Sequence, residues 1–193
     1  MTMTKTLIVP GLDGSPAPHW QHWWAQTDPH AQMVDLSFPH HPSPEVWEFE
    51  LAGAILQHPD TVLVGHSLGA VLIARLLTKW PHLRVSAALL VAPAETAGND
   101  HIGHFGAIPE QSLDLPAIVV GSRNDPWMSF ERASALAGVW GAQLVDLGDA
   151  GHVNVASGYG PWPQGKALAA MLRPEPLASA PRRMAHKEGG LWL

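Results

Sequence analysis

The chain has no cysteine among its 193 residues. This absence excludes disulfide bonds, thiol nucleophiles and zinc sites with cysteine ligands. Basic residues are also scarce: 11 Lys and Arg stand against 17 Asp and Glu, and the formal charge is −6. A chain of this charge offers no broad positive surface for phosphates, so nucleic acid is not an expected partner.

Long hydrophobic runs are missing as well. The apolar stretch before Pro10 is only Leu7–Val9, which is shorter than a membrane span or the core of a signal peptide. We therefore expect a cytoplasmic protein that does not use a membrane. The length fits one domain, which we place at residues 1–173. The Pro- and Ala-rich segment 174–193 is predicted to be a loosely ordered tail.

Short apolar runs alternate along the chain with segments of helical length. This alternation is typical of a parallel sheet with helices on both faces, in a three-layer α/β/α fold. Six parallel strands are predicted, at Thr6–Val9, Gln32–Leu36, Thr61–Val64, Val85–Val91, Ala117–Val120 and Gln143–Leu147. Five helices are predicted, at His19–Gln26, Ser43–His58, Ser67–Lys79, Phe130–Trp140 and Pro163–Leu172. The connection 93–115 has little helical pattern, so it is either a cover for a site or a loose crossover.

The sequence Gly-His-Ser-Leu-Gly at positions 65–69 follows the third predicted strand and precedes a helix. A serine on such a sharp turn needs a strained backbone, and larger side chains two residues away on either side would collide. Gly65 and Gly69 remove those side chains. The pattern therefore predicts that Ser67 is a nucleophile exposed at the end of the sheet.

Serine needs an adjacent base, and the base needs an orienting carboxylate. Asp125 directly follows the fifth predicted strand, and His152 follows the sixth in a glycine-rich loop. We assign His152 as the base and Asp125 as the acid. Three rival acids are Asp100, Asp146 and Asp149; Asp146 falls inside a predicted strand, and Asp149 is close to His152 in sequence.

The backbone amides of Leu68 and Leu12 are the expected oxyanion hole, because the first follows the nucleophile and the second lies in the loop after the first strand. Substrate contacts are assigned to Trp127 and Trp162, which lie near the catalytic residues, and to His66, which is adjacent to Ser67. Trp20, Trp23 and Trp24 share a helical face and are assigned to the core. No metal or other cofactor is expected, because the pairs His19/His22 and His101/His104 lack further ligands in zinc-site spacing.

Four segments carry a resemblance to a known family. They are the Gly11–Gly14 loop with His-Trp-Gln-His-Trp at 19–23, the 65–69 turn, Gly-Ser-Arg-Asn-Asp-Pro-Trp at 121–127, and Gly-His-Val-Asn-Val-Ala-Ser-Gly-Tyr-Gly-Pro-Trp at 151–162. The chain resembles the small serine hydrolases related to retinoblastoma-binding protein 9 and YdeN. The resemblance implies a minimal α/β-hydrolase fold without a cap domain, and Ser67, Asp125 and His152 as its triad.

These patterns predict a serine hydrolase. It would cleave small esters, thioesters or activated amides of a small-molecule acyl substrate through an acyl-enzyme on Ser67. The alternative is a protein that keeps the fold but uses the cavity to bind a protein or a small molecule without catalysis. The sequence names neither the acyl group nor the leaving group.

Overall fold

Six strands form a single parallel sheet in the computed structural model, which describes residues 4–172. The predicted tail, 174–193, lies outside the described residues. The strands are β1 (Thr6–Val9), β2 (Ala31–Met33), β3 (Thr61–His66), β4 (Val85–Val91), β5 (Ala117–Gly121) and β6 (Gln143–Asp146). Their order in the sheet is β2-β1-β3-β4-β5-β6, so the chain reverses direction across the sheet between β1 and β3. Parallel sheets place their ligand sites beyond the carboxyl ends of the strands at such a reversal.

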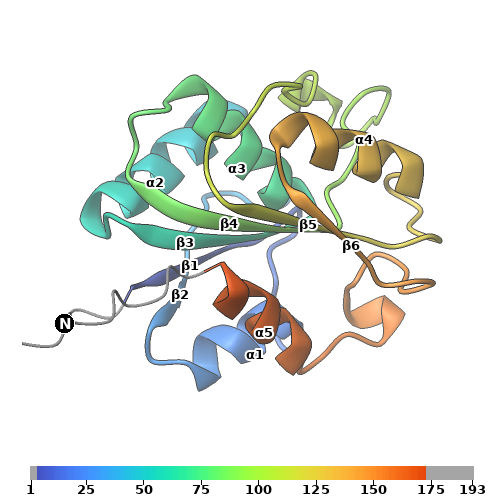
Figure 1. Ribbon diagram of the computed structural model, residues 1–193, viewed down its shortest axis with the longest axis horizontal. Coiled ribbons are helices and arrows are strands. Elements are labelled where there is room, and N and C mark those ends of the chain that lie inside the picture. The colour runs from blue at the N-terminus through green and yellow to red at the C-terminus, as the bar shows by residue number, and fades with distance from the viewer. Residues whose placement is uncertain (1–3, 173–193) are drawn as a thin grey trace, which may run out of the picture.

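Helices cover both faces of this sheet. They are α1 (Trp20–Thr27), α2 (Pro44–Gln57), α3 (Leu68–Lys79), α4 (Phe130–Trp140) and α5 (Pro163–Met171), with short 3-10 helices η1 (Gly103–Phe105) and η2 (Val155–Ser157). Figure 1 shows α2, α3 and α4 on one face and α1 and α5 on the other. The predicted three-layer architecture is thus confirmed. Within residues 4–172, no helix is both long and apolar enough to cross a bilayer.

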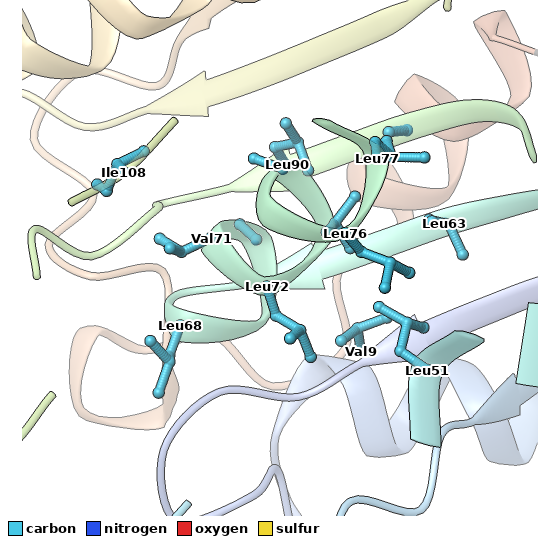
Figure 2. Packing of buried hydrophobic residues seen from close by; sticks show 14 of the residues in the cluster. Val9, Leu51, Leu63, Leu68, Val71, Leu72, Leu76, Leu77, Leu90 and Ile108 are labelled. Atoms are coloured by element: carbon cyan, nitrogen blue, oxygen red, sulfur yellow. The ribbon is translucent and has the colours of Figure 1, made fainter. Parts of the chain in front are cut away.

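The helix that follows Ser67 lies at the centre of the larger core. Leu68, Val71, Leu72 and Leu76 of α3 are fully buried and pack with apolar residues of β1, β3, β4 and α2 (Figure 2). Burial of each such leucine contributes roughly 2 kcal/mol. Because the nucleophile immediately precedes α3, this packing anchors the turn that carries it.

A smaller core lies on the other face of the sheet. It joins Ile8 and Val64 of the strands to Trp20, Trp24 and Trp162, and all five residues are buried. Trp23 is only partly buried and packs at the edge of this cluster. The prediction that the tryptophans of α1 are core residues therefore holds for Trp20 and Trp24.

The connection 93–115 is a packed crossover. Ile102, Phe105 and Ile108 are buried in the larger core, and the Thr96 hydroxyl donates to the Gly106 carbonyl at 2.6 Å. Arg75 of α3 donates to the Phe105 carbonyl, which fixes η1 over the end of the sheet. The segment also covers the candidate site in part, because Ile102 lines its cavity.

The main difference from the predicted strands concerns β2, expected at 32–36 and found at Ala31–Met33. Among residues 4–172, it pairs only with the four-residue β1, which ends at Val9. The Val34 amide makes one more bond, to the Ile8 carbonyl, before the partner strand ends. The apolar residues Val34 and Leu36 continue into the core without strand pairing.

Candidate active site

The carboxyl ends of β1, β3, β5 and β6 bring six of the predicted site residues to one cavity of about 260 Å³. The residues that line it are Leu12, Asp13, Gly14, His19, His66, Ser67, Leu68, Ile102, Trp127, His152, Asn154, Val155 and Ala156. Of the predicted substrate contacts, Trp127 and His66 are in this lining, whereas Trp162 is not. The cavity size suits a small substrate.

Ser67 lies on a strained turn at the end of β3, with φ 56° and ψ −124°. A Cβ atom at position 65 would lie 2.8 Å from the Ala70 Cα, and one at position 69 would lie 2.3 Å from the Val9 carbonyl oxygen. Both glycines are therefore required sterically, as predicted. The obstacle at Gly69, however, is the end of β1 rather than the turn itself.

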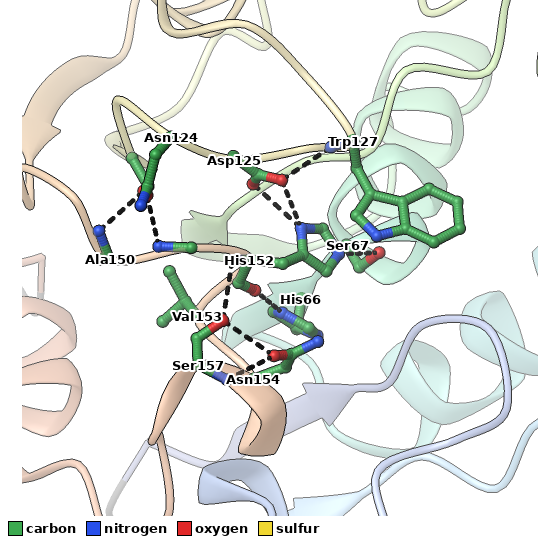
Figure 3. Close-up of polar contacts among 12 residues, drawn as sticks. His66, Ser67, Asn124, Asp125, Trp127, Ala150, His152, Val153, Asn154 and Ser157 are labelled. Carbon is green, nitrogen blue, oxygen red and sulfur yellow. Dashed lines mark hydrogen bonds and ion pairs between the residues drawn. The ribbon is translucent and has the colours of Figure 1, made fainter.

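Three polar side chains form a continuous hydrogen-bonded chain (Figure 3). The Ser67 Oγ lies 2.8 Å from the His152 Nε2, and the His152 Nδ1 lies 2.9 Å from both carboxylate oxygens of Asp125. The Asp125 Oδ1 also accepts the Trp127 amide N–H at 2.9 Å. The side chains of His152 and Asp125 are only 7% and 3% exposed, so bulk water does not compete for these bonds.

A second set of bonds holds the loops after β5 and β6 together. The Ser122 hydroxyl accepts the Ala150 N–H at 3.0 Å and donates to the Asn124 Oδ1 at 2.9 Å. The same Asn124 oxygen accepts the Gly151 N–H at 2.6 Å. These bonds cross from the loop of Asp125 to the loop of His152, so they set the separation of the two side chains.

The loop after β1 lies directly against the Ser67 turn. A Cβ atom on Gly11 would be 3.0 Å from the Ser67 Cβ and 3.3 Å from the Leu68 amide nitrogen. Leu12 and Leu68 both line the cavity, and their amides have no hydrogen-bond acceptor among residues 4–172. Two free amides beside a serine hydroxyl can bind a developing oxyanion.

His66 is buried beneath the reacting groups and links the two halves of the site. Its Nε2–H donates to the His152 carbonyl oxygen at 2.8 Å, and its ring lies 5.0 Å from the His152 ring, centre to centre. Burial, together with the nearby His152 and His19, lowers the pKa of His66 well below its ordinary value. His66 is therefore neutral at neutral pH.

The two tryptophans predicted to contact substrate have different positions. Trp127 is partly buried in the cavity wall, with its ring 5.6 Å from that of His152. Trp162 is only 4% exposed and packs edge-on against Trp20 at 5.2 Å in the smaller core. The structure thus places Trp162 in the core, because α5 folds back onto the sheet and buries the residue at its start.

Several residues of the cavity wall have no site role in the sequence-based prediction, among them His19, Ile102 and Asn154. The sequence pattern places His19 at the start of a helix and shows no further metal ligands beside the His19/His22 pair, so nothing in it marks His19 as a cavity residue. Ile102 belongs to a segment without periodicity. The rival acid Asp146 is instead paired with Arg123 at the surface.

Comparison with known proteins identifies the family of the chain. The sequence profile described as "Serine hydrolase" matches residues 6–171. Among solved structures, a YdeN-like hydrolase from Pectobacterium atrosepticum has 32% identity and a TM-score of 0.79, with 89% of this chain and 94% of that chain covered. The ydeN gene product of Bacillus subtilis has 23% identity and a TM-score of 0.68, with 88% and 98% covered. None of the curated proteins matches the chain.

A third structure, a carboxylesterase from Bacillus cereus, has 14% identity and a TM-score of 0.58, with 88% of this chain and 87% of that chain covered, and supports the fold alone. The resemblance to YdeN-like hydrolases is confirmed, whereas that to retinoblastoma-binding protein 9 stays a prediction. The profile covers nearly the whole described region and the serine-bearing turn lies within it. The chain therefore belongs to the serine hydrolase family.

Proposed function

We propose that the protein hydrolyses small esters, thioesters or activated amides through an acyl-enzyme on Ser67. The observation that carries this proposal is the chain of bonds from the Ser67 hydroxyl through the His152 ring to the Asp125 carboxylate, with distances of 2.8 Å and 2.9 Å. Such a chain activates a hydroxyl that is otherwise a weak nucleophile at neutral pH.

The reaction follows from the positions of these groups. The Ser67 Oγ attacks the substrate carbonyl while the His152 Nε2 takes the hydroxyl proton, and Asp125 stabilises the charged ring. The amides of Leu12 and Leu68 bind the oxyanion. His152 then gives its proton to the leaving alcohol, thiol or amine, and the acyl-enzyme remains. In the second half-reaction His152 takes a proton from water, which attacks the acyl carbon. The carboxylic acid then leaves as His152 returns the proton to the Ser67 Oγ.

The cavity favours a small acyl or alcohol group. Leu12, Ile102 and Val155 line it together with the Trp127 ring, and its volume is about 260 Å³. Ligands of greater volume occupy pockets of roughly 300–1,000 Å³. Esters of short acyl chains are therefore the expected substrates.

A fluorophosphonate probe tests this proposal, because it phosphonylates only a serine whose hydroxyl is activated. The expected result is stoichiometric labelling of Ser67 in the native protein and none in Ser67→Ala. The same substitution is expected to lower the kcat for p-nitrophenyl acetate by at least about 10³-fold. A native protein that does not label, in which Ser67→Ala changes no ester turnover, would instead support the binding-protein alternative.

A further inference from the structure

Two polar side chains in the cavity wall take no part in the proposed mechanism. The first is His19, which is 6% exposed. Its Nδ1 accepts the Gln21 N–H at 3.2 Å at the start of α1, so the proton of the neutral ring lies on Nε2. Burial, and to a lesser extent His152, lowers the pKa of His19 to about 4, so the ring stays neutral at neutral pH. His19 thus offers one uncharged N–H donor.

The second is Asn154, whose orientation is fixed by Ser157. The Asn154 Oδ1 accepts both the N–H and the hydroxyl of Ser157, at 3.1 and 3.0 Å. Only the carboxamide oxygen can accept these bonds, so the Nδ2 group must point away from Ser157. Figure 3 shows the pair next to the His152 loop. Asn154 thus offers a second uncharged donor.

Neither donor has a partner within the part of the chain that the structure describes. Among residues 4–172, the His19 Nε2 and the Asn154 Nδ2 have no hydrogen-bond acceptor. They are also not sealed inside the protein, because the Trp162 Nε1 is the one buried side-chain N or O atom of the described residues that lacks a partner. The opening that both residues share is the cavity.

The charge around the cavity decides what these donors can bind. None of the described residues that line it is Lys or Arg. Asp13 lies in the wall with its side chain 66% exposed, and the Asp125 carboxylate lies behind His152. A substrate carboxylate or phosphate would meet the Asp13 carboxylate and no lysine or arginine, whereas an uncharged oxygen atom would gain hydrogen bonds without repulsion.

We propose that His19 and Asn154 form a subsite that donates hydrogen bonds to an uncharged ether, hydroxyl or carbonyl oxygen near the scissile bond. The inference deepens the proposed function and rests on it. The enzyme then prefers short oxygen-substituted esters to alkyl esters of the same shape and to esters that carry a carboxylate. Replacing a methylene group with oxygen keeps the size and adds only the acceptor, so the subsite can be tested without a change in volume.

Two isosteric pairs of esters test this preference. Phenyl methoxyacetate is compared with phenyl butyrate for an acceptor in the acyl group, and 2-methoxyethyl butyrate with butyl butyrate for one in the alcohol. For each pair, the ratio of the two kcat/KM values is divided by the ratio of the two rates of hydroxide-catalysed hydrolysis, which corrects for the different intrinsic reactivity of the esters. We expect a preference of about tenfold for the methoxy ester in one pair, as one good hydrogen bond provides. The subsite is overturned if neither pair shows a preference for the methoxy ester. It is also overturned if phenyl hydrogen succinate, which carries a carboxylate, is turned over faster than phenyl methoxyacetate.

Two variants locate the donors. Asn154→Asp keeps an oxygen for Ser157 and replaces the donating nitrogen; His19→Ser keeps a helix-capping acceptor and removes the Nε2–H. Each variant is expected to lower the corrected preference for the methoxy ester at least threefold. The control is His22→Ser, which lies in α1 but outside the cavity lining and is expected to leave this preference unchanged. An unchanged preference in both variants overturns the proposal. Fluorophosphonate labelling of Ser67 is measured in parallel. If the native protein is not labelled, the proposed function is rejected. If it is labelled but shows no preference for the methoxy esters, only the subsite is rejected.

Discussion

The turn that carries Ser67 and the loops that carry Asp125 and His152 reach the same cavity, but different forces hold them. Close packing fixes the turn, because a Cβ atom on either flanking glycine would come within 3 Å of neighbouring atoms. Hydrogen bonds fix the loops, since Ser122 and its neighbours tie the end of β5 to the end of β6.

This difference determines how each part responds to substitution. A larger side chain in the tightly packed turn overlaps neighbouring atoms, so the strand and the helix on either side must move and the fold loses stability. Loss of a hydrogen bond between the two loops lets them move apart, which changes the geometry of the site more than the stability of the fold. We therefore expect stability and activity to separate between the two regions.

The largest expected effect is on activity and lies in the loops. Asp125→Asn keeps an oxygen that can accept the Trp127 N–H, but it no longer holds the His152 ring in the tautomer that accepts a proton. We expect the kcat for p-nitrophenyl acetate to fall by about 10⁴-fold with only a small change in Tm. Asp146→Asn, which removes the rival acid at the surface, serves as the control and is expected to leave kcat unchanged. A kcat within tenfold of the native value would remove Asp125 from the triad.

The next largest effect is on stability and lies in the turn. In Gly69→Ala the new methyl group would lie 2.3 Å from the Val9 carbonyl oxygen, so β1 or α3 must move. We expect the free energy of unfolding, measured with urea, to fall by about 3 kcal/mol or more. Gly53→Ala is the matched control, because it also lies within a helix but nothing lies within 4 Å of its Cβ position. That change is expected to stabilise by roughly 0.5–1 kcal/mol, and equal losses in both variants would contradict the steric account.

A smaller, mixed effect is expected where the two loops are joined. Ser122→Ala removes the hydroxyl that accepts the Ala150 N–H and donates to the Asn124 Oδ1, while the Ala150 N–H keeps its second acceptor, the Gly148 carbonyl at 3.1 Å. We therefore expect the free energy of unfolding to fall by about 1 kcal/mol. Because the lost bonds set the spacing of the loops, we also expect kcat to fall about tenfold with little change in KM. The exposed Ser112→Ala is the control for loss of a hydroxyl. If kcat stays unchanged while stability falls, the loops are positioned by something other than these bonds.

The same difference explains what the sequence could predict. The Gly65 to Gly69 turn was predictable because steric needs leave few residue choices. The apolar runs predicted six strands because strands buried on both faces need apolar residues, although β2 is found at Ala31–Met33 and not at 32–36. Asp125 and His152 were predictable from their places after strands. The bonds through Ser122 and Asn154 were not, because a serine or asparagine in a loop has many possible partners. Trp162 was assigned to the cavity from its nearness in sequence to His152, which says nothing about the face of the sheet onto which α5 folds.

One residue joins the two regions, and pH tests that link. His66 is the last residue of β3, and its Nε2–H donates to the His152 carbonyl oxygen at 2.8 Å. Burial lowers the pKa of His66 well below its ordinary value and that of neighbouring His19 to about 4, whereas both rings titrate near 6.5 in the unfolded chain. Below about pH 6.5 the unfolded state therefore binds more protons, and the free energy of unfolding must decrease as the pH falls.

We expect a loss of about 1 kcal/mol for each of these two rings between pH 7 and 5.5, measured by urea unfolding. His19→Ser should remove about half of this loss, because it removes one of the two buried rings and keeps a cap for α1. A pH dependence that is unchanged in His19→Ser, or a protein that becomes more stable on acidification over this range, would show that the rings are not held neutral. In that case His66 would not be the fixed donor that connects the packed turn to the hydrogen-bonded loops.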